Sequence, residues 1–425
     1  MLSVSHRVAA LKPSVTIAFM NRAKAMQRAG KDVLSFAAGE PDFDTPQAIK
    51  DAAIKALLAG QTKYMPTLGD PDTRAAVAKK LTEENNIPNC TADHIAIGAG
   101  GKHSLFVLCH VLLDDAVTAG NGVAVSGYTK QEVVLPVPAW VSYAPIVELA
   151  GGKVVEVPTT VESGFKASAE QIRRAITPNT RLLILNSPSN PCGTMYTPDE
   201  LKAIAKVVDE ASKTIAPNIT VLSDELYEKI IYGGIPHFSI GSVPEIAERV
   251  ITLNGLSKAY GMTGWRIGYT GASGAFGRRF TDAMATLQGQ MSTNITSFTY
   301  PAIRAALTQC AGEVEKMRLA FASRAEVMNA CLAKLPGIKN AKATGAFYAF
   351  PEVSSHFGKT SKGGRKISNA LAFCEALLEE NLVAFVPGDD FGGCGKDHVR
   401  ISFACSEQQI RAGVDRFGEF LAGLR

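Results

Sequence analysis

One lysine in this sequence has the surroundings that a covalent reaction with a carbonyl compound requires. Lys258 follows the apolar run of residues 250–254, in the glycine-rich stretch LNGLSKAYGMTGWRIG, which also carries Arg266. A lysine on an exposed helix needs no such surroundings. A lysine amine attacks a carbonyl group, forming a Schiff base, when burial or a neighbouring cation lowers its pKa. The stretch therefore indicates a lysine held in a confined site.

Other polar side chains follow short apolar runs that are typical of strands. Asp224 and Tyr227 come directly after ITVLS, and Asn190 lies in a Pro- and Gly-rich turn after RLLILN. Taken singly, Asp224 is equally well explained as a helix N-cap, Tyr227 as a core aromatic and Arg266 as a surface cation. Ligands of open α/β sheets bind beyond the carboxyl ends of the strands, so the shared position of these residues indicates one site.

An anion site is predicted in HIAIGAGGKHSLF, which has the pattern strand, turn and helix. Gly100 and Gly101 would leave backbone N–H groups free where the helix begins, and such groups bind anions. Lys102 in the first turn opposes the helix dipole unless an anion lies nearby. A glycine-rich turn alone is usually only structural, but the lysine favours the anion.

These residue types together fit pyridoxal 5′-phosphate. Its carbonyl needs an amine, its pyridine nitrogen needs a carboxylate that keeps it protonated, and its phosphate needs an arginine and free N–H groups. A phenol and an amide suit the ring hydroxyl, and a flat aromatic such as Trp140 can stack on the ring, although a core position is the simpler explanation of a tryptophan. The sequence supplies every one of these groups.

The elements that must position these residues alternate between helix and strand from about residue 45. Thr45 is expected as an N-cap before Pro46, in a helix that stops at Gly60, and Thr197 with Glu200 predicts a capping box. Between the helices lie runs rich in Val, Ile and Leu, as in strands buried on both faces of a parallel sheet: HIAIG, KVVEV, RLLILN, ITVLSDE, RVITLN and WRIGYT. The pattern predicts an α/β fold.

The pattern changes near residue 299, where a long helical stretch runs to about residue 334 and looser alternation follows. We expect a large domain over 45–298 and, over 299–425, an interdomain helix with a smaller α+β domain. Residues 1–44 are expected to form an N-terminal arm and part of the small domain. Two glycine-rich loops, near 117–130 and 358–366, are predicted to be surface insertions.

The composition disfavours several other classes of protein. A chain of 425 residues, 46% hydrophobic, is long enough for two or three packed domains, and a net charge of +4 does not favour nucleic-acid binding. No apolar run approaches the roughly 20 residues of a membrane span. Eight cysteines without a C-x-x-C pair indicate neither a metal site nor a disulfide framework. The basic N-terminal segment is interpreted as an arm of a cytoplasmic protein rather than a transit peptide.

The segment 255–268 resembles, at each constrained position, the cofactor-attachment signature of class I pyridoxal-phosphate-dependent aminotransferases. AAGEPDFDTP, SPSNPCGT, VLSDELY and GAFY match that family in the same order, and the similarity runs from residue 11 to the last helix. It is closest to the bacterial-type aspartate aminotransferase subgroup, which includes prephenate aminotransferases. The resemblance implies fold type I, with a mostly parallel sheet in the large domain, a pyridoxal 5′-phosphate cofactor and a homodimer with shared active sites.

The resemblance also implies a role for each matching residue. The catalytic positions are Lys258, which bonds to the cofactor and moves the proton, Asp224 at the pyridine nitrogen, and Tyr227. The cofactor-binding positions are Gly101, Lys102, Trp140, Asn190, Asp224, Tyr227, Ser257, Lys258 and Arg266, with Tyr64 donated by the neighbouring subunit. The substrate-binding positions are Gly39, Lys12, Lys102, Trp140, Asn190 and Arg400, of which Gly39 and Arg400 hold the α-carboxylate. No metal is implied.

The implied reaction is a ping-pong transamination of an acidic amino acid. In the subgroup that the chain resembles, a lysine at the position of Lys102 binds the distal carboxylate of the substrate, and the residue at the position of Lys12 is associated with prephenate recognition. Aspartate or glutamate is therefore expected, with arogenate and prephenate as further candidates. Lys102 could instead serve only the phosphate and Lys12 only the solvent. Another class I specificity (alanine, aromatic or kynurenine) or a β-lyase stays open. A cofactor-binding regulatory module is disfavoured because few residues precede Lys12 for an appended DNA-binding domain.

Overall fold

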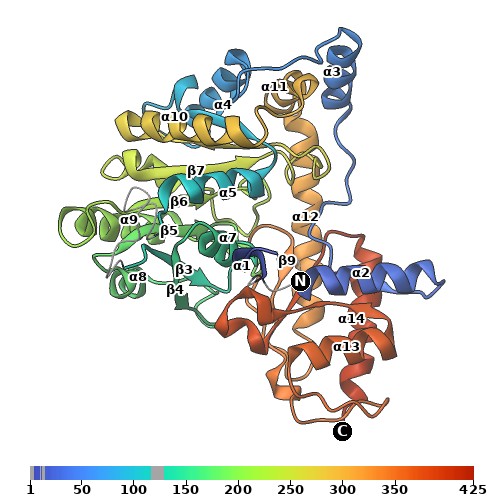
Figure 1. The fold of residues 1–425 in the computed structure, drawn as a ribbon. Coiled ribbons are helices and arrows are strands. Elements are labelled where there is room, and N and C mark those ends of the chain that lie inside the picture. Colours follow the sequence, from blue (N-terminus) through green and yellow to red (C-terminus); the bar gives the residue numbers. More distant parts are fainter. Residues whose placement is uncertain (1–3, 10, 12–14, 116–128) are drawn as a thin grey trace.

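The structure is a computed structural model, which describes residues 4–9, 11, 15–115 and 129–425. Figure 1 shows a central sheet between helices, with the C-terminal helices and α2 gathered to one side of it. The helices named below are α1 (His6–Ala9), α2 (Val15–Arg28), α3 (Gln47–Leu58), α4 (Pro71–Glu83), α5 (Gly101–Leu112), α7 (Tyr143–Leu149), α8 (Ala169–Ala175), α9 (Pro198–Lys213), α10 (Gly274–Met291), α11 (Tyr300–Gln309), α12 (Ala311–Leu332), α13 (Ala370–Asn381) and α14 (Glu407–Ala422).

Over the residues that the structure describes, the central sheet has seven strands in the order β2-β8-β7-β6-β5-β3-β4. Only β8 runs antiparallel to its neighbours, so the predicted mostly parallel α/β sheet is confirmed. The strands are β2 (Ile95–Gly98), β3 (Glu132–Val137), β4 (Lys153–Pro158), β5 (Thr180–Asn186), β6 (Thr220–Asp224), β7 (Val250–Gly255) and β8 (Gly268–Gly271). Strand β3 was not among the predicted runs, because Pro136 interrupts its apolar pattern.

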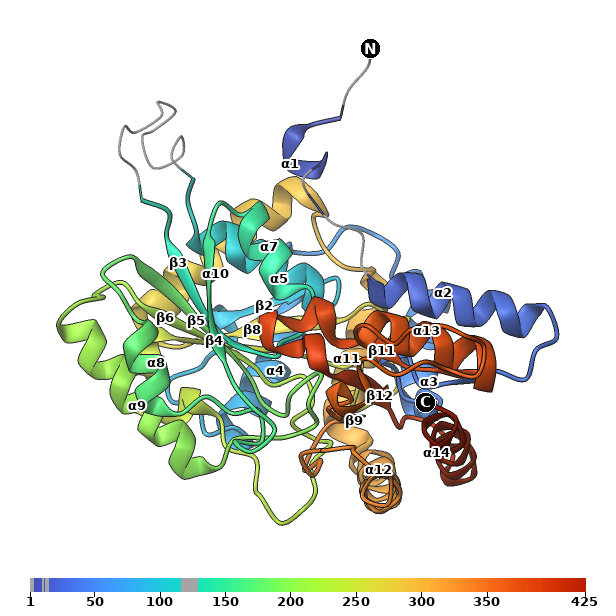
Figure 2. The same ribbon diagram turned by 90° about the horizontal axis from the view of Figure 1, so that it is seen from below.

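The strands are buried on both faces, as their unbroken apolar runs predict. In β5, Leu182 and Ile184 pack beneath α5, α7 and α10, whereas Leu183 and Leu185 pack beneath α8 and α9. A third cluster joins α3, α4 and α11 to the β2 edge of the sheet. Helices cover both faces of the sheet (Figure 2), so a ligand is expected at the strand ends.

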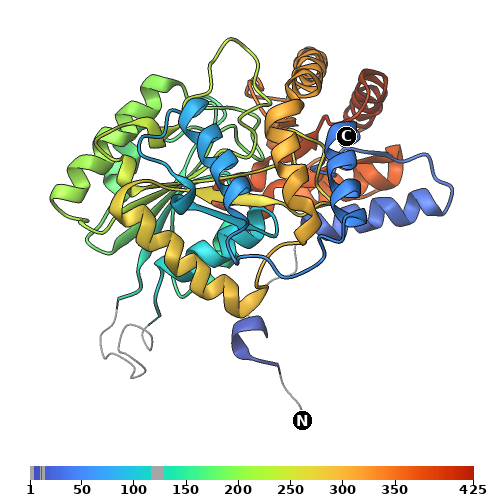
Figure 3. The ribbon, with the colours of Figure 1, turned by 90° about the horizontal axis from the view of Figure 1, so that it is seen from above.

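Short strands and long helices make up the part beside the sheet. Strand β1 (Leu34–Ser35) pairs with β10 (Val383–Ala384), and β12 (Val399–Ser402) lies between β11 (Val386–Pro387) and β9 (Tyr348–Ala349). Helices α12, α13 and α14 pack around them, and α2 lies alongside (Figure 3). The predicted helical stretch over 299–334 is two helices, α11 and α12, which meet at Cys310. The predicted domain boundaries near residues 44 and 298 stay a prediction.

The predicted helix starts were right in one case and wrong in another. Thr197 and Glu200 form the expected capping box at α9. Thr45 does not cap α3, whose N-cap position is Pro46. The Thr45 hydroxyl instead donates to the Gly261 carbonyl at 2.8 Å and accepts from the Trp265 indole at 3.1 Å. A tertiary contact with the Lys258 loop therefore replaces the local cap.

The two predicted insertions have different outcomes. Most of the loop near 117–130 lies outside the described residues. The loop near 358–366 is hydrogen-bonded to the C-terminus and to α13. The Thr360 N–H donates to the Arg425 carbonyl at 2.7 Å, and the Ser361 hydroxyl donates to Glu380 at 2.5 Å. Every helix in the described part of the chain is too short or too polar to cross a membrane.

Candidate active site

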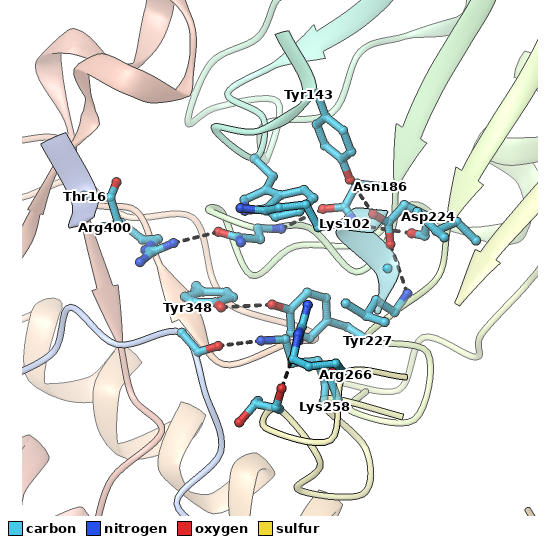
Figure 4. Close-up of a pocket in the computed structure, with 18 residues that line it drawn as sticks. Thr16, Lys102, Tyr143, Asn186, Asp224, Tyr227, Lys258, Arg266, Tyr348 and Arg400 are labelled. Atoms are coloured by element: carbon cyan, nitrogen blue, oxygen red, sulfur yellow. Dashed lines mark hydrogen bonds between the residues drawn. The ribbon is translucent and has the colours of Figure 1, made fainter. Parts of the chain in front are cut away.

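A cavity of about 320 Å³ opens at the carboxyl ends of the central strands (Figure 4). Its charged lining is strongly unbalanced, with four cations, Lys102, Lys258, Arg266 and Arg400, against one acid, Asp224. The complete lining is Thr16, Gly39, Gly101, Lys102, Trp140, Tyr143, Asn186, Asn190, Asp224, Leu226, Tyr227, Leu253, Ser257, Lys258, Thr263, Arg266, Tyr348 and Arg400. Because charges in a confined site need partners, this lining fits a ligand set that carries several negative charges.

Lys258 lies just past the end of β7, with its side chain in the cavity. Its amine donates to the Gly39 carbonyl at 2.5 Å and lies 5.8 Å from the ring centres of Tyr227 and Phe347. Burial, followed by the charge of Arg400, lowers the pKa of Lys258 to about 8. A substantial fraction of the amine is therefore neutral and nucleophilic near physiological pH.

Asp224 ends β6 and presents its carboxylate to the same cavity. One oxygen accepts from the Tyr143 hydroxyl at 2.6 Å, and the other accepts from the Leu226 N–H at 3.2 Å. The Asn186 amide donates to the Asp224 carbonyl at 3.1 Å and fixes the strand end. Burial raises the pKa of Asp224 to about 6 although the Tyr143 hydrogen bond opposes the rise. The group is thus an anion at neutral pH, able to pair with a protonated ring nitrogen.

The start of α5 and Arg266 form the end of the cavity suited to a phosphate. Gly100 has φ +94°, and a Cβ there would lie 2.5 Å from the Arg266 guanidinium, so only glycine allows this close approach. Arg266 itself has φ +56° and donates to the Thr263 carbonyl at 2.9 Å. Burial and the charge of Arg266 lower the pKa of Lys102. Two adjacent cations at a helix N-terminus, with Ser257 in the same lining, fit an anionic group.

Arg400, on β12, is a buried cation that has no carboxylate partner among the described residues. Its guanidinium donates to the Asn190 side-chain oxygen at 3.1 Å and to the Ala37 carbonyl at 2.9 Å. Nε has no partner in the described part of the chain, and the rings of Tyr348 and Phe391 lie 4.9 and 5.3 Å away. A buried guanidinium without an anion is costly, and its planar fork matches a carboxylate. Arg400 is therefore placed to receive a carboxylate ligand.

Tyr227 shares a hydrogen bond with Tyr348, whose hydroxyl oxygen lies 2.9 Å from its own. Burial, followed by the neighbouring Tyr348, raises the pKa of Tyr227 well above its usual value. The phenol is therefore neutral and can donate a hydrogen bond to a ligand oxygen in the cavity.

The structure brings together all but two of the residues that the sequence nominated. Tyr64 does not line this cavity and is 88% exposed, and Lys12 lies outside the described residues. Seven lining residues were not predicted from the sequence: Thr16, Tyr143, Asn186, Leu226, Leu253, Thr263 and Tyr348. All but Thr16 stand in or at the end of a strand run or motif, such as RLLILN for Asn186 and GAFY for Tyr348, so a local signal existed for them.

Thr16 had no such signal. It lies on α2, far from the other lining residues in sequence, and its side chain is buried. Its hydroxyl has no hydrogen-bond partner among the described residues. An unpaired buried hydroxyl in a ligand cavity is most simply satisfied by the ligand.

Comparison with known proteins agrees with this site. The family model described as "Aminotransferase class I and II" matches residues 31–417. The chain is 40% identical to an aspartate aminotransferase of Geobacillus stearothermophilus, with 99% of each chain covered. It is 39% identical to an aspartate/prephenate aminotransferase of Cereibacter sphaeroides, with 100% of each covered. The structure of a Thermus thermophilus aspartate aminotransferase with maleate superposes with a TM-score of 0.87 at 38% identity, covering 99% of this chain and 100% of that one.

Proposed function

Because the chain belongs to the class I and II aminotransferases, we propose that it exchanges an amino group between an acidic L-amino acid and a 2-oxo acid. Aspartate and glutamate are the proposed donors, with arogenate and prephenate as further candidates on the strength of the relatives' names. The observation that carries the proposal is the charge of the cavity, four cations against one acid. The negative charges of a phosphate and two carboxylates would offset this excess of positive charge.

The cofactor of this family, pyridoxal 5′-phosphate, fits the residues present. It supplies a carbonyl that reacts with amines and a ring that accepts the electron pair released at the substrate Cα. Gly101, Ser257 and Arg266 would hold its phosphate, and Asp224 would pair with its ring nitrogen. The indole of Trp140 would cover the ring, while Asn190 and Tyr227 would contact its hydroxyl.

Lys258 is proposed to perform the proton transfers. The pKa of its amine is about 8, so the amine is mostly neutral above that pH, and Nζ can take the proton from the substrate Cα as a general base. Arg400 and Asn190 would hold the α-carboxylate, since the guanidinium already contacts the Asn190 oxygen. The Gly39 carbonyl accepts a hydrogen bond from Lys258 and so holds the lysine amine within the cavity. The two half-reactions would use the same groups in reverse order, and the first product would leave before the second substrate binds, which gives ping-pong kinetics.

The pKa of Lys258 leads to a pH prediction for the protein freed of its cofactor. Only the neutral amine reacts, so the rate of cofactor capture should rise with pH, with a midpoint near 8 rather than the value of about 10.4 for lysine in water. Stopped-flow absorbance after mixing with pyridoxal 5′-phosphate measures this rate. A midpoint near 10 would contradict the lowered pKa, and Lys258→Ala should remove the phase altogether.

The distal carboxylate of the substrate is assigned to Lys102. Its amine lies 5.0 Å from the Trp140 ring centre, and the residue lines the cavity at a position that is also exposed to solvent. The unpaired Thr16 hydroxyl lines the same cavity and offers a second contact. The Thermus thermophilus relative was solved with maleate, a dicarboxylate, which supports a dicarboxylic ligand here.

Replacing Lys102 by glutamine should lower kcat/KM for aspartate by about 10- to 100-fold, because a charge-assisted hydrogen bond is lost. The value for alanine, which has no distal carboxylate, should change little. Steady-state kinetics with both donors measures the difference. An equal loss for both donors, with weaker cofactor binding, would assign Lys102 to the phosphate instead.

The donor class itself is tested by single half-reactions. The holoenzyme is mixed separately with aspartate, glutamate, alanine, phenylalanine and arogenate, and the cofactor absorbance is followed. We expect fast conversion by aspartate and glutamate only, and conversion by arogenate would add the prephenate branch. Conversion by alanine or phenylalanine alone would overturn the acidic specificity but leave the family membership intact.

Assembly as a homodimer is also part of the proposal. Tyr64 is too exposed to serve its own chain's cavity, which suits a side chain that reaches the site of a neighbouring subunit. Apolar side chains on the nearby α3, Ile54, Leu57 and Leu58, are exposed as well, as expected of a surface that a partner covers. The role of Lys12 in substrate binding stays a prediction, and so does the cytoplasm as the location of the protein.

A further inference from the structure

A cluster of buried polar side chains lies directly behind the turn that carries Asp224 and Tyr227. Lys80, Asn85, Glu225 and Glu228 are at most 6% exposed, and the His237 side chain is 15% exposed. Lys80 lies on α4 and Asn85 just after that helix, whereas the other three lie in the loop that follows β6. The lining of the ligand cavity includes none of these five, so the cluster belongs to no function assigned above.

Within this cluster, Glu225 is fully used as a hydrogen-bond acceptor. One carboxylate oxygen accepts from Ser223 at 2.8 Å and from Ser239 at 2.6 Å. The other accepts from the Asn85 amide at 2.8 Å and lies 3.1 Å from His237 Nε2. Four donors on one carboxylate fix its position and leave it no freedom to rotate.

Glu228 is held by the same groups from the other side. It is ion-paired with Lys80, and the Asn85 amide donates to it at 2.7 Å, so Asn85 links the two acids. Burial opposes the charge of Glu228, but Lys80, His237 and Lys229 together outweigh it and lower the pKa of Glu228 to about 2. Burial likewise opposes a charge on His237, but Glu225 and Glu228 together outweigh it and raise the pKa of His237. Two anions thus face two cationic groups.

This balance argues against a metal site. Ligand atoms of Glu225, Glu228 and His237 do lie within 4.8 Å of one another, as a metal would require. The Lys80 ammonium already supplies the positive charge that a metal ion would bring. The cluster is therefore a closed network of the protein's own groups.

The turn itself divides its side chains between the two sites. Asp224 and Tyr227 point into the ligand cavity, whereas Glu225 and Glu228 belong to the buried cluster behind it. The backbone between them is short and hydrogen-bonded, from the Glu225 N–H to Leu253 at 2.9 Å and from the Glu228 N–H to the Glu225 carbonyl at 2.9 Å. A shift of either glutamate therefore moves the neighbouring residue that faces the cavity.

We propose that this cluster, and Glu225 above all, is a positioning site that fixes Asp224 and Tyr227 against the cofactor. The inference rests on the proposed function of these two residues. Buried ion pairs add little net stability compared with apolar residues of the same size, so stability alone does not account for such a network. A fixed turn does account for it, because a displacement of about 1 Å at a catalytic group can cost about 10²-fold in rate.

The test compares Glu225→Gln with His237→Gln and with a matched control, Glu132→Gln. Glutamine at 225 keeps the shape of the side chain but replaces one carboxylate oxygen by an NH2 group. That group would face other donors, either Asn85 and His237 or the two serines. His237→Gln is the milder variant, because its site is partly exposed and glutamine can still donate to Glu225. Glu132 is also buried and ion-paired, accepting from Thr177 at 2.6 Å and Lys153 at 3.0 Å, but it starts β3 and does not line the cavity.

Each variant is measured as holoenzyme for Tm, for cofactor Kd, for the pH midpoint of the cofactor's visible absorbance and for kcat and KM. We expect Glu225→Gln and His237→Gln to weaken cofactor binding, to shift that midpoint and to lower kcat by about 10- to 100-fold with KM nearly unchanged. Glu132→Gln should lower Tm alone. If Glu225→Gln does not fold, His237→Gln decides.

The proposal would be overturned if both cluster variants kept the wild-type absorbance midpoint and the wild-type cofactor Kd while their Tm fell. The cluster would then contribute to stability alone. The wild-type enzyme keeps this outcome separate from a failure of the proposed function. If the wild type binds the cofactor but converts no amino acid, the function is wrong, whereas the cofactor Kd and the absorbance midpoint still test the positioning role.

Discussion

Replacing Lys258 by alanine is expected to lower kcat for transamination by at least about 10⁴-fold, because the variant loses both the amine that bonds to the cofactor and the base at Cα. The wild-type amine is well placed for both tasks, since it lies inside the cavity with a pKa of about 8. Single-turnover absorbance measurements with aspartate or glutamate, and steady-state rates, measure the loss. The fold should survive, because within the described part of the chain the side chain makes a single hydrogen bond, to Gly39.

The matched control for this prediction is Lys258→Arg, which keeps a positive charge but presents no nucleophile near neutral pH. It should be as inactive as the alanine variant while binding the cofactor's phosphate through Arg266 and Gly101. Activity of either variant within about tenfold of wild type would remove Lys258 from the reaction.

The parts of the site that could be predicted from the sequence are those set by position along a strand. Lys258, Asp224 and Asn190 each follow an apolar run, and the ends of parallel strands converge on one edge of the sheet. The α/β fold could be predicted in a similar way, because strands that are buried on both faces have a distinctive apolar composition. These inferences need only local sequence and one rule of topology.

What could not be predicted depends on contacts between segments distant in sequence. Tyr143 reaches Asp224 over a separation of 81 residues, and Lys80 reaches Glu228 over 148. Thr16 enters the cavity because α2 packs beside β10 and β11, which no local pattern specifies. Thr45 shows the same effect in reverse, since a bond to Gly261 replaced the cap that its neighbours predicted. Tertiary geometry therefore supplies the support of the site, whereas local sequence supplies its reactive groups.

Replacing Asp224 by asparagine is expected to lower kcat by about 10³-fold at every pH, the second large effect. Asparagine has nearly the same shape but no charge, so it cannot keep the cofactor's ring nitrogen protonated, and the ring then accepts electrons poorly. Stopped-flow half-reactions with the preferred amino acid measure the loss. Cofactor binding should weaken but persist through the phosphate end of the cavity, so measurements at saturating cofactor keep low occupancy from explaining a lower rate.

Tyr143→Phe is the control that separates the charge of Asp224 from its mere presence. The Tyr143 hydroxyl lowers the pKa of Asp224, which burial alone would push above its value of about 6. Without the hydroxyl the carboxylate protonates at a higher pH, so cofactor affinity should fall near pH 6 and stay close to wild type at pH 8. If Asp224→Asn kept most of its activity, or if Tyr143→Phe weakened binding equally at both pH values, a charged Asp224 would not be what the cofactor's ring requires. The two variants together therefore test whether the electrostatics of this strand end, rather than its shape, drives the chemistry.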